Sequence, residues 1–296
     1  MYDIDKIYEA NSVREAIALL TEHPEAKVIA GGSDVLIKIR EGKMAGCTLV
    51  SIYGLDELRG VTMLEDGTVR IGALTSFSDV AKDPIIQRTV PVLADAVSQV
   101  GGPQIRNIGT IGGNVSNGVT SADSASTLFA FNAHLEIEGP DGVRVTPIGE
   151  HYVSAGKVNL RQGDILRAIL IRKADYAGHF GHYIKYSMRK AMDIATLGCA
   201  VVVQLDEEKQ TLSDVRLAFG VAGPIPMRCP GAERAAIGKR LCEETLDAFA
   251  ENALAEVTPR TSWRASKEFR LQLTHELSRR ALAKAIALAG GVIHAN

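Results

Sequence analysis

The sequence predicts an α+β protein built from two successive parts, with a boundary near residue 177. In the first part, strand-like and helical segments alternate along the chain. From about Ala174 onward, three longer apolar strands come first and the helices are grouped after them, which is typical of an α+β domain. We therefore expect one domain over residues 1–176 and a second over residues 177–291.

The N-terminal segment predicts a small βαβ-like unit. Ser12 and Glu15 form a capping-box pattern, and apolar residues follow at helical spacing until Pro24 ends the helix. "AKVIAGGSD" then predicts a short buried strand that runs into a turn, and "CTLVSI" predicts a second strand.

The rest of the first part alternates in the same way. "GTVRIGALTSFSDVAKDP" predicts a strand followed by a helix that begins near Ser76 or Ser78. "TVPVLADAVSQV" predicts a helix that the next glycine pair stops. After a short helix from about Ala125, "HLEIEGPDGVRVTPI" predicts a hairpin with Pro-Asp-Gly at its turn, and "DILRAILIRK" predicts a closing strand.

The second part begins with an antiparallel sheet. "HYIKYSMRKAMDIATLGCAVVVQL" and "LSDVRLAFGVAG" together predict three strands. The chain is helical from about Thr245, and its longest helix is expected over residues 266–289.

Composition argues against several functions. The net charge of −2 gives no electrostatic reason to expect nucleic acid or an anionic membrane as a partner, and aromatic residues make up only 5%. No window approaches the ~20 apolar residues that span a bilayer. The N-terminal segment has no basic region followed by an apolar run, so we expect no signal peptide and a cytoplasmic location.

Two glycine-rich turns are candidates for phosphate binding: "AGGSD" at residues 30–34 and "TIGGN" at residues 110–114. Glycine lets backbone N–H groups approach a ligand closely, and successive N–H groups can form a concave anion site. Each turn taken singly is more often a simple tight turn. The short polar side chains of "VSNGVTSADS", directly after the second turn, favour a pyrophosphate held between the two turns.

The usual nucleotide motifs do not occur. No two glycines are separated by a single residue, which excludes G-x-G-x-x-G, and the chain has no P-loop. A dinucleotide would therefore bind by a non-Rossmann route. The stretch over residues 101–124, with six glycines and three asparagines, is long for a loop and is not expected to build a core.

No hydrolytic or metal centre is evident. Neither G-x-S-x-G nor H-E-x-x-H occurs, and no cysteine lies in a C-x-x-C pair, so we expect free thiols and no metal site. We interpret His179 and His182 as surface or interface residues. Lys185 lies in an alternating strand and faces either solvent or a bound anion, with solvent favoured by the local pattern alone.

Four stretches together resemble the FAD-binding subunits of the molybdenum hydroxylases, and most closely the bacterial xanthine dehydrogenase subunits. They are "AGGSDVLIKIR", "GGPQIRNIGTIGGNVSNGVTSADS", "YIKYSMRKAMDIATLGCAVV" and "SWRASKEFR". The resemblance covers nearly the whole chain. It implies an FAD-binding domain of the vanillyl-alcohol-oxidase type in two α/β subdomains, followed by a C-terminal domain of antiparallel sheet and helices.

The resemblance also implies the FAD contacts. The segment Lys27–Asp34, which includes the first turn, would wrap the pyrophosphate, and the second turn would meet the pyrophosphate and ribityl chain. Asp123 would hydrogen-bond the cofactor, and Ile165 or Leu166 would lie beside the adenine. Lys185 would lie near the flavin ring, which reverses the solvent interpretation. The implied contacts are Lys27, Val28, Ile29, Ala30, Gly31, Gly32, Ser33, Asp34, Val100, Thr110, Ile111, Gly112, Gly113, Asn114, Asp123, Ile165, Leu166 and Lys185. No acid–base catalyst is implied.

The implied activity is electron transfer. Substrate would be hydroxylated at the molybdopterin of a large partner subunit, and electrons would pass through [2Fe–2S] clusters of a small subunit to FAD and then to NAD⁺. A heterotrimer or a dimer of heterotrimers is expected. The chain lacks the cysteine-bearing insertion of the benzoyl-CoA-type reductases. The alternatives are a flavoprotein subunit for another heterocycle, an aldehyde or CO, a stand-alone flavin oxidase, and a nucleotide-binding regulatory subunit.

Overall fold

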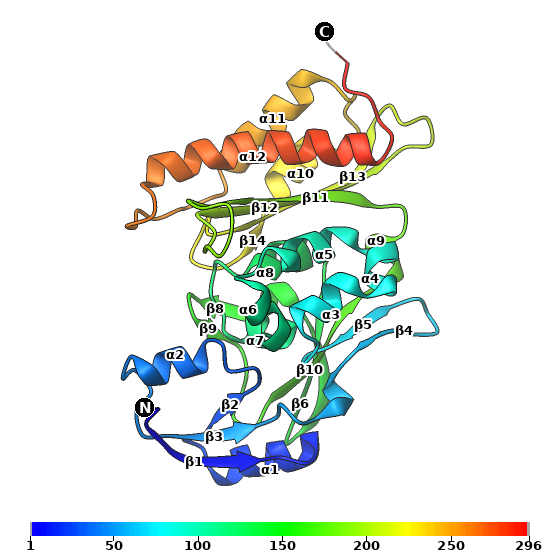
Figure 1. The fold of residues 1–296 in the computed structure, drawn as a ribbon. Helices are drawn as coiled ribbons and strands as arrows, with labels where there is room; N and C mark the ends of the chain where they lie inside the picture. The colour runs from blue at the N-terminus through cyan, green and yellow to red at the C-terminus, as the bar shows by residue number, and fades with distance from the viewer. Residues whose placement is uncertain (1, 295–296) are drawn as a thin grey trace.

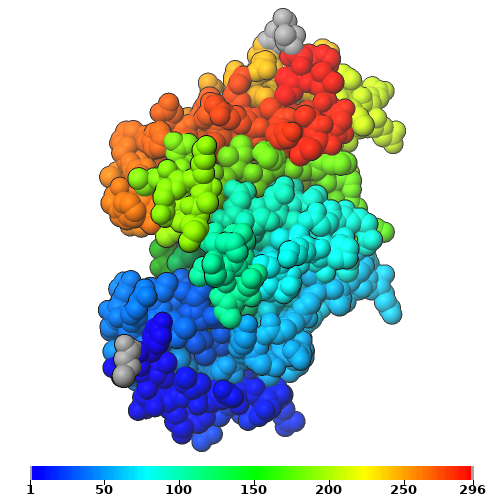
Figure 2. All heavy atoms as spheres, in the orientation of Figure 1, coloured from blue at the N-terminus to red at the C-terminus, as the bar shows by residue number. Residues whose placement is uncertain are grey.

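Three larger sheets follow one another along the molecule in the computed structural model, which describes residues 2–294 (Figure 1). Figure 2 shows the N-terminal residues in blue at one end, the residues that follow them in the sequence in cyan at the centre, and the C-terminal residues in orange and red at the other end. The α+β class expected from the sequence is confirmed. No helix within the described range is both long and apolar enough to cross a membrane.

The first sheet is parallel and has the order β1-β3-β2. Its elements are β1 (Ile4–Glu9), α1 (Val13–Glu22), β2 (Lys27–Ile29), α2 (Val35–Arg40) and β3 (Cys47–Ser51). The capping box is confirmed, because the Ser12 hydroxyl accepts a hydrogen bond from the Glu15 N–H at 3.1 Å. The expectation that β2 is buried was wrong, since an edge strand leaves Lys27 exposed and its neighbours half-buried.

The second sheet is antiparallel, with the order β4-β5-β10-β6-β7. The predicted hairpin forms β6 and β7, and the predicted helix α3 begins after Ser76, whose hydroxyl accepts from the Asp79 N–H. The elements are β4 (Val61–Met63), β5 (Val69–Gly72), α3 (Phe77–Lys82), α4 (Pro84–Thr89), α5 (Pro91–Ser98), α8 (Asp123–Ala130), β6 (His134–Gly139), β7 (Gly142–Pro147) and β10 (Ile165–Ile171).

Residues 101–124 do not form a bare loop. They contain the helices α6 (Pro103–Ile108) and α7 (Ile111–Ser116) and lead into α8. Ile111 and Val115 are fully buried in the central core, so the expectation that this stretch contributes nothing to a core was wrong. Residues four apart share one helix face, and the turn of α7 therefore directs both apolar side chains inward while Gly113 stays exposed.

The third sheet is antiparallel, in the order β11-β12-β13-β14, and both of its faces are covered (Figure 1). Alternate residues of β12 pack against two different cores: Val201 lies in the core under the C-terminal helices, and Val202 lies in the core shared with α5 and α8. The elements are β11 (Phe180–Tyr186), β12 (Leu197–Leu205), β13 (Leu212–Gly220), β14 (Met227–Arg228), α10 (Pro230–Ala236), α11 (Glu243–Leu254) and α12 (Lys267–Leu288). The three predicted strands and the long helix are confirmed.

Short elements complete the described chain. They are the 3-10 turns η1 (Asp56–Leu58) and η2 (Ile148–Glu150), the ribbon of β8 (Tyr152–Ser154) and β9 (Lys157–Val158), and α9 (Lys173–Tyr176), which leads from the second sheet to the third.

Candidate functional site

A cleft of about 570 Å³ lies between the turn that follows β2 and the helix α7. This volume is within the usual range of small-molecule sites. All of the residues that the sequence predicts as FAD contacts line this cleft except Ile29, Ile111, Asp123 and Lys185. The structure therefore brings both glycine-rich turns, Val100 and the start of β10 to one place.

The first turn offers free backbone donors. The N–H groups of residues 31–34 donate no hydrogen bond to any residue within the described range, although these residues line the cleft. Gly32 has a φ of +74°, and a Cβ at Gly31 would lie 1.8 Å from the Ile108 carbonyl oxygen. Both positions thus require glycine, and the resulting row of N–H groups suits the oxygens of a phosphate.

The second turn differs from the expectation that both turns offer amides. The N–H groups of Ile111 and Gly112 donate to the carbonyls of Thr75 and Ala73, and the Gly113 N–H donates to the Thr110 hydroxyl at 3.1 Å. A Cβ at Gly113 would meet only that hydroxyl within 4 Å. This turn therefore contributes open space and polar side chains rather than free amides.

The start of β10 forms another wall of the cleft, through Ile165 and Leu166. The preceding Asp164 has a side chain only 1% exposed. Its Oδ1 accepts from Arg144 Nη1 at 2.8 Å, Arg144 Nη2 bonds its Oδ2, and the Arg161 N–H donates to it at 2.6 Å. Because these donors occupy both carboxylate oxygens, Asp164 holds the wall of the cleft in place and its negative charge is already paired.

Asp123 and Lys185 lie outside the cleft and contact each other. Lys185 Nζ is 2.7 Å from Asp123 Oδ2 and also donates to the Gln99 carbonyl at 2.9 Å, while the Tyr183 hydroxyl donates to Asp123 Oδ1 at 2.8 Å. Burial raises the pKa of Asp123, and the charge of Lys185 opposes that rise. The interpretation of Lys185 as a solvent-facing side chain was wrong, because its side chain is only 5% exposed. Direct contact of either residue with FAD stays a prediction.

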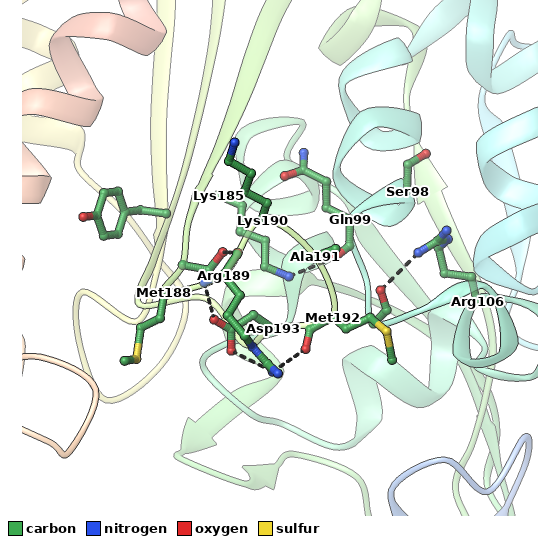
Figure 3. Close-up of a pocket in the computed structure, with 13 residues that line it drawn as sticks. Ser98, Gln99, Arg106, Lys185, Met188, Arg189, Lys190, Ala191, Met192 and Asp193 are labelled. Carbon is green, nitrogen blue, oxygen red and sulfur yellow. Dashed lines mark hydrogen bonds and ion pairs between the residues drawn. The ribbon is translucent and has the colours of Figure 1, made fainter.

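A second pocket, of about 500 Å³ (Figure 3), shares the segment 100–106 with the cleft. Residues 185–193, at the end of β11 and in the connection that follows it, line it together with Ser98 and Gln99 at the end of α5, Gly101, and Arg106 of α6. The cations Arg106, Arg189 and Lys190 line it, and its carboxylate Asp193 accepts from the Arg189 N–H at 2.9 Å. The stretch that contains this connection carried the family resemblance, but no residue pattern in it indicated a pocket.

The remaining candidates have structural roles. The side chain of His179 is only 4% exposed, with Nε2 3.0 Å from Asp214 Oδ2 and 3.2 Å from Arg216 Nη2, so the interpretation of it as a surface residue was wrong. His182 is half-buried. The four cysteines are free thiols, and burial raises the pKa of Cys199 and Cys229. Within residues 2–294, no group of three or more His, Cys, Asp or Glu side chains is placed to hold a metal ion.

Known proteins match this chain over nearly its whole length. The family model described as the FAD binding domain in molybdopterin dehydrogenase matches residues 2–172, and that described as the CO dehydrogenase flavoprotein C-terminal domain matches residues 182–285. The putative xanthine dehydrogenase FAD-binding subunit of Escherichia coli K12 is 45% identical, with 98% of this chain and 99% of that subunit covered.

More distant relatives support the same assignment. The carbon monoxide dehydrogenase medium chain of Hydrogenophaga pseudoflava is 32% identical, with 93% of this chain and 95% of that one covered. The solved carbon monoxide dehydrogenase from the same organism superposes with a TM-score of 0.92, at 32% identity, with 97% of this chain and 99% of that one covered.

The fold, the cleft and the matched domains define an oxidoreductase subunit with an FAD-binding domain. Within that class, the chain belongs to the family of FAD-binding subunits of the molybdenum hydroxylases, which includes the xanthine dehydrogenase flavoproteins. The residues present fit FAD, because the free amides of the first turn suit a pyrophosphate and the exposed Gly113 leaves room beside it.

Proposed function

We propose that this chain is the FAD-carrying electron-transfer subunit of a xanthine dehydrogenase. Electrons would come from the [2Fe–2S] clusters of a small partner subunit and leave to NAD⁺, while hydroxylation would take place at the molybdopterin of a large partner. Bound FAD supplies the redox chemistry, because it accepts electrons singly and releases them as a hydride. The 45% identity to the Escherichia coli subunit over 98% of this chain supports xanthine rather than another substrate.

The row of free amides in the first turn is the observation that carries the cofactor assignment. Residues 31–34 line the cleft, their four N–H groups have no acceptor within the described chain, and Gly113 leaves open space in the wall formed by α7. Gly32 is buried and Gly31 and Ser33 are half-buried, so a bound group with several acceptor oxygens would give these N–H groups the hydrogen bonds that the chain itself does not supply. The pyrophosphate of FAD provides such oxygens.

The second pocket supports NAD⁺ as the acceptor. Segment 100–106 borders both sites, since Val100 and Ile105 line the cleft while Gly101 and Arg106 line the pocket. Arg189 and Lys190 add positive charge (Figure 3), and the side chain of Arg189 is 69% exposed. A cationic pocket beside the flavin site suits an anionic nucleotide that takes a hydride from it.

We also propose a division of labour between the two parts. Residues 1–176 hold FAD, and residues 177–291 complete the acceptor pocket and contribute to docking with the partner subunits. A heterotrimer, or a dimer of heterotrimers, agrees with relatives that are named as subunits or medium chains of larger enzymes. The free thiols fit the reducing conditions of the cytoplasm, which we propose as its location.

The decisive experiment uses the purified chain alone and then the complex. The chain alone should be yellow, show flavin absorbance, and reduce a dye with NADH in the absence of any purine. The complex should contain molybdenum and iron and oxidise xanthine. A colourless chain that takes up no added FAD would refute the cofactor assignment. A complex that oxidises CO, an aldehyde or another heterocycle instead of xanthine would refute the assignment of xanthine as the substrate.

A variant tests the acceptor separately. Changing Arg189 and Lys190 to Glu should raise the KM for NADH about tenfold or more while FAD content stays unchanged, because the reversed charge repels the nucleotide phosphates. An unchanged KM would refute NAD⁺ binding in this pocket.

A further inference from the structure

Lys38 of α2 reaches across the cofactor cleft to the opposite wall. Its Nζ donates to the side-chain oxygen of Asn117 at 2.9 Å, although the two residues are 79 positions apart. Both residues line the cleft. Asn117 is the residue that ends α7, and its own N–H donates to the Gly113 carbonyl at 2.9 Å, so its backbone is held in place.

The segment that carries Lys38 is weakly attached to the rest of the protein. Ile39 is the one fully buried residue of α2, and Ile37 is 42% exposed. Gly42 and Gly46 follow the helix with positive φ and with open space where a Cβ would lie. Within the described residues, the Lys38–Asn117 contact is the side-chain hydrogen bond that joins α2 to the far wall.

The charges of the cleft favour a dianion near Lys38. Its lining residues include Lys27, Lys38 and Lys157 against Asp34 and Asp164, and Asp164 is already paired with Arg144. Lys27 and Lys157 are exposed, whereas Lys38 is half-buried and lies one helical turn after the end of the free amide row. An ammonium group has three donors, and the contact with Asn117 uses one of them.

We propose that Lys38 and Asn117 form a clasp over the bound cofactor, in which Lys38 binds Asn117 and the FAD pyrophosphate together. The inference rests on the proposed FAD binding and adds Lys38 and Asn117 to the contacts that the resemblance implies. The clasp closes α2 over the dinucleotide, and it therefore controls how fast FAD leaves the protein. The amide row holds the pyrophosphate from one side, and the lysine holds it from the open side.

The test measures FAD release by the recovery of flavin fluorescence, with the full chain and no turnover. Lys38→Met and Asn117→Ala should each speed FAD release, Lys38→Met by roughly 10- to 100-fold because it removes a charged hydrogen bond. The double variant should release FAD no faster than Lys38→Met, because the two residues act as a unit. Lys38→Arg should restore most of the retention, and Lys43→Met, on the same segment but outside the cleft, should behave like the unchanged protein.

Binding of riboflavin distinguishes the loss of a phosphate contact from a general disruption of the fold. Riboflavin lacks the pyrophosphate, so Lys38→Met should leave its affinity unchanged, and the thermal midpoint of the FAD-free variant should match that of the unchanged chain. Wild-type release rates in Lys38→Met would overturn the proposal. If Lys38→Met releases FAD faster but Asn117→Ala releases it at the wild-type rate, the proposed clasp between the two residues is wrong. If the unchanged chain binds no FAD, the proposed function fails instead.

Discussion

Lys185 of β11 pairs with Asp123 of α8 across the junction between the FAD-binding part and the C-terminal sheet, with 2.7 Å between Nζ and Oδ2. The two side chains are only 5% and 7% exposed. The Tyr183 hydroxyl donates a hydrogen bond to the other carboxylate oxygen, Asp123 Oδ1, at 2.8 Å. A charge pair buried this deeply joins the two parts of the chain, alongside the contacts of Arg216 with Asp175 and of Arg228 with Asn132.

Breaking this pair should destabilise the protein strongly. Asp123→Ala leaves the Lys185 ammonium buried without a counter-charge, and we expect the free energy of unfolding to fall by about 3–5 kcal/mol. Urea denaturation of the FAD-free chain measures the change. Adding Lys185→Met should recover part of the loss, because no unpaired charge remains; strictly additive effects would contradict the coupling.

The same variant also tests the predicted contact with FAD. If Asp123 hydrogen-bonds the cofactor, Asp123→Ala should weaken FAD binding by roughly 1–3 kcal/mol. Titration under conditions where the apo variant is folded measures the affinity. An unchanged dissociation constant would assign Asp123 a purely structural role.

Gly113 should tolerate no side chain while FAD is bound. Gly113→Val places a branched side chain in the open space of the cleft, displaces the Thr110 hydroxyl, and should abolish FAD retention while the C-terminal domain stays folded. Flavin absorbance per protein measures the retention. Gly54→Val is the matched control, because a Cβ there meets nothing within 4 Å. Full FAD content in Gly113→Val would contradict the role of this glycine.

The Arg144–Asp164 pair should stabilise the wall of the cleft. Arg144→Met leaves the carboxylate of Asp164, whose side chain is 1% exposed, without its bidentate partner, and should cost about 3–5 kcal/mol of unfolding free energy. Arg161→Met removes an arginine that is 68% exposed and 4.0 Å from Asp141, and should cost less than about 1 kcal/mol. Equal losses in the two variants would contradict the difference in burial.

His151 should make the protein less stable in mild acid. Both ring nitrogens are buried without a hydrogen-bond partner, and burial lowers the pKa of His151 from 6.5 to about 4. Between these two values the unfolded chain binds a proton that the folded chain does not, so stability falls as the pH falls. This histidine alone should account for about 2 kcal/mol between pH 7 and pH 5.

The variant His151→Phe should lose that much less stability over the same pH range. Unfolding free energies at several pH values measure the slope, and His294→Asn, which removes an exposed histidine, should keep the wild-type slope. An identical slope in His151→Phe and the unchanged protein would show that His151 does not titrate in this way.

The sequence predicted correctly those helices and strands that depend on residues close together in the chain. The caps at Ser12 and Ser76, the β6–β7 hairpin and the strands of the third sheet follow from short-range spacing and hydrophobicity. The strand β1 and the helix α2 were missed, because β1 is mostly exposed and α2 buries one residue fully, so neither carries a clear periodic signal. The helices α6 and α7 were missed because glycine and asparagine are poor helix formers.

The sequence by itself determined the family of this protein, its α+β class, and the two glycine turns that line the cleft, because these features depend on residue type and short spacing. Only the tertiary structure decided which backbone amides remain free, that Lys185 meets Asp123, and that Lys38 meets Asn117. These pairs are separated by 62 and 79 residues. Their distances result from the packing of one sheet or helix on another, and no local pattern specifies that packing.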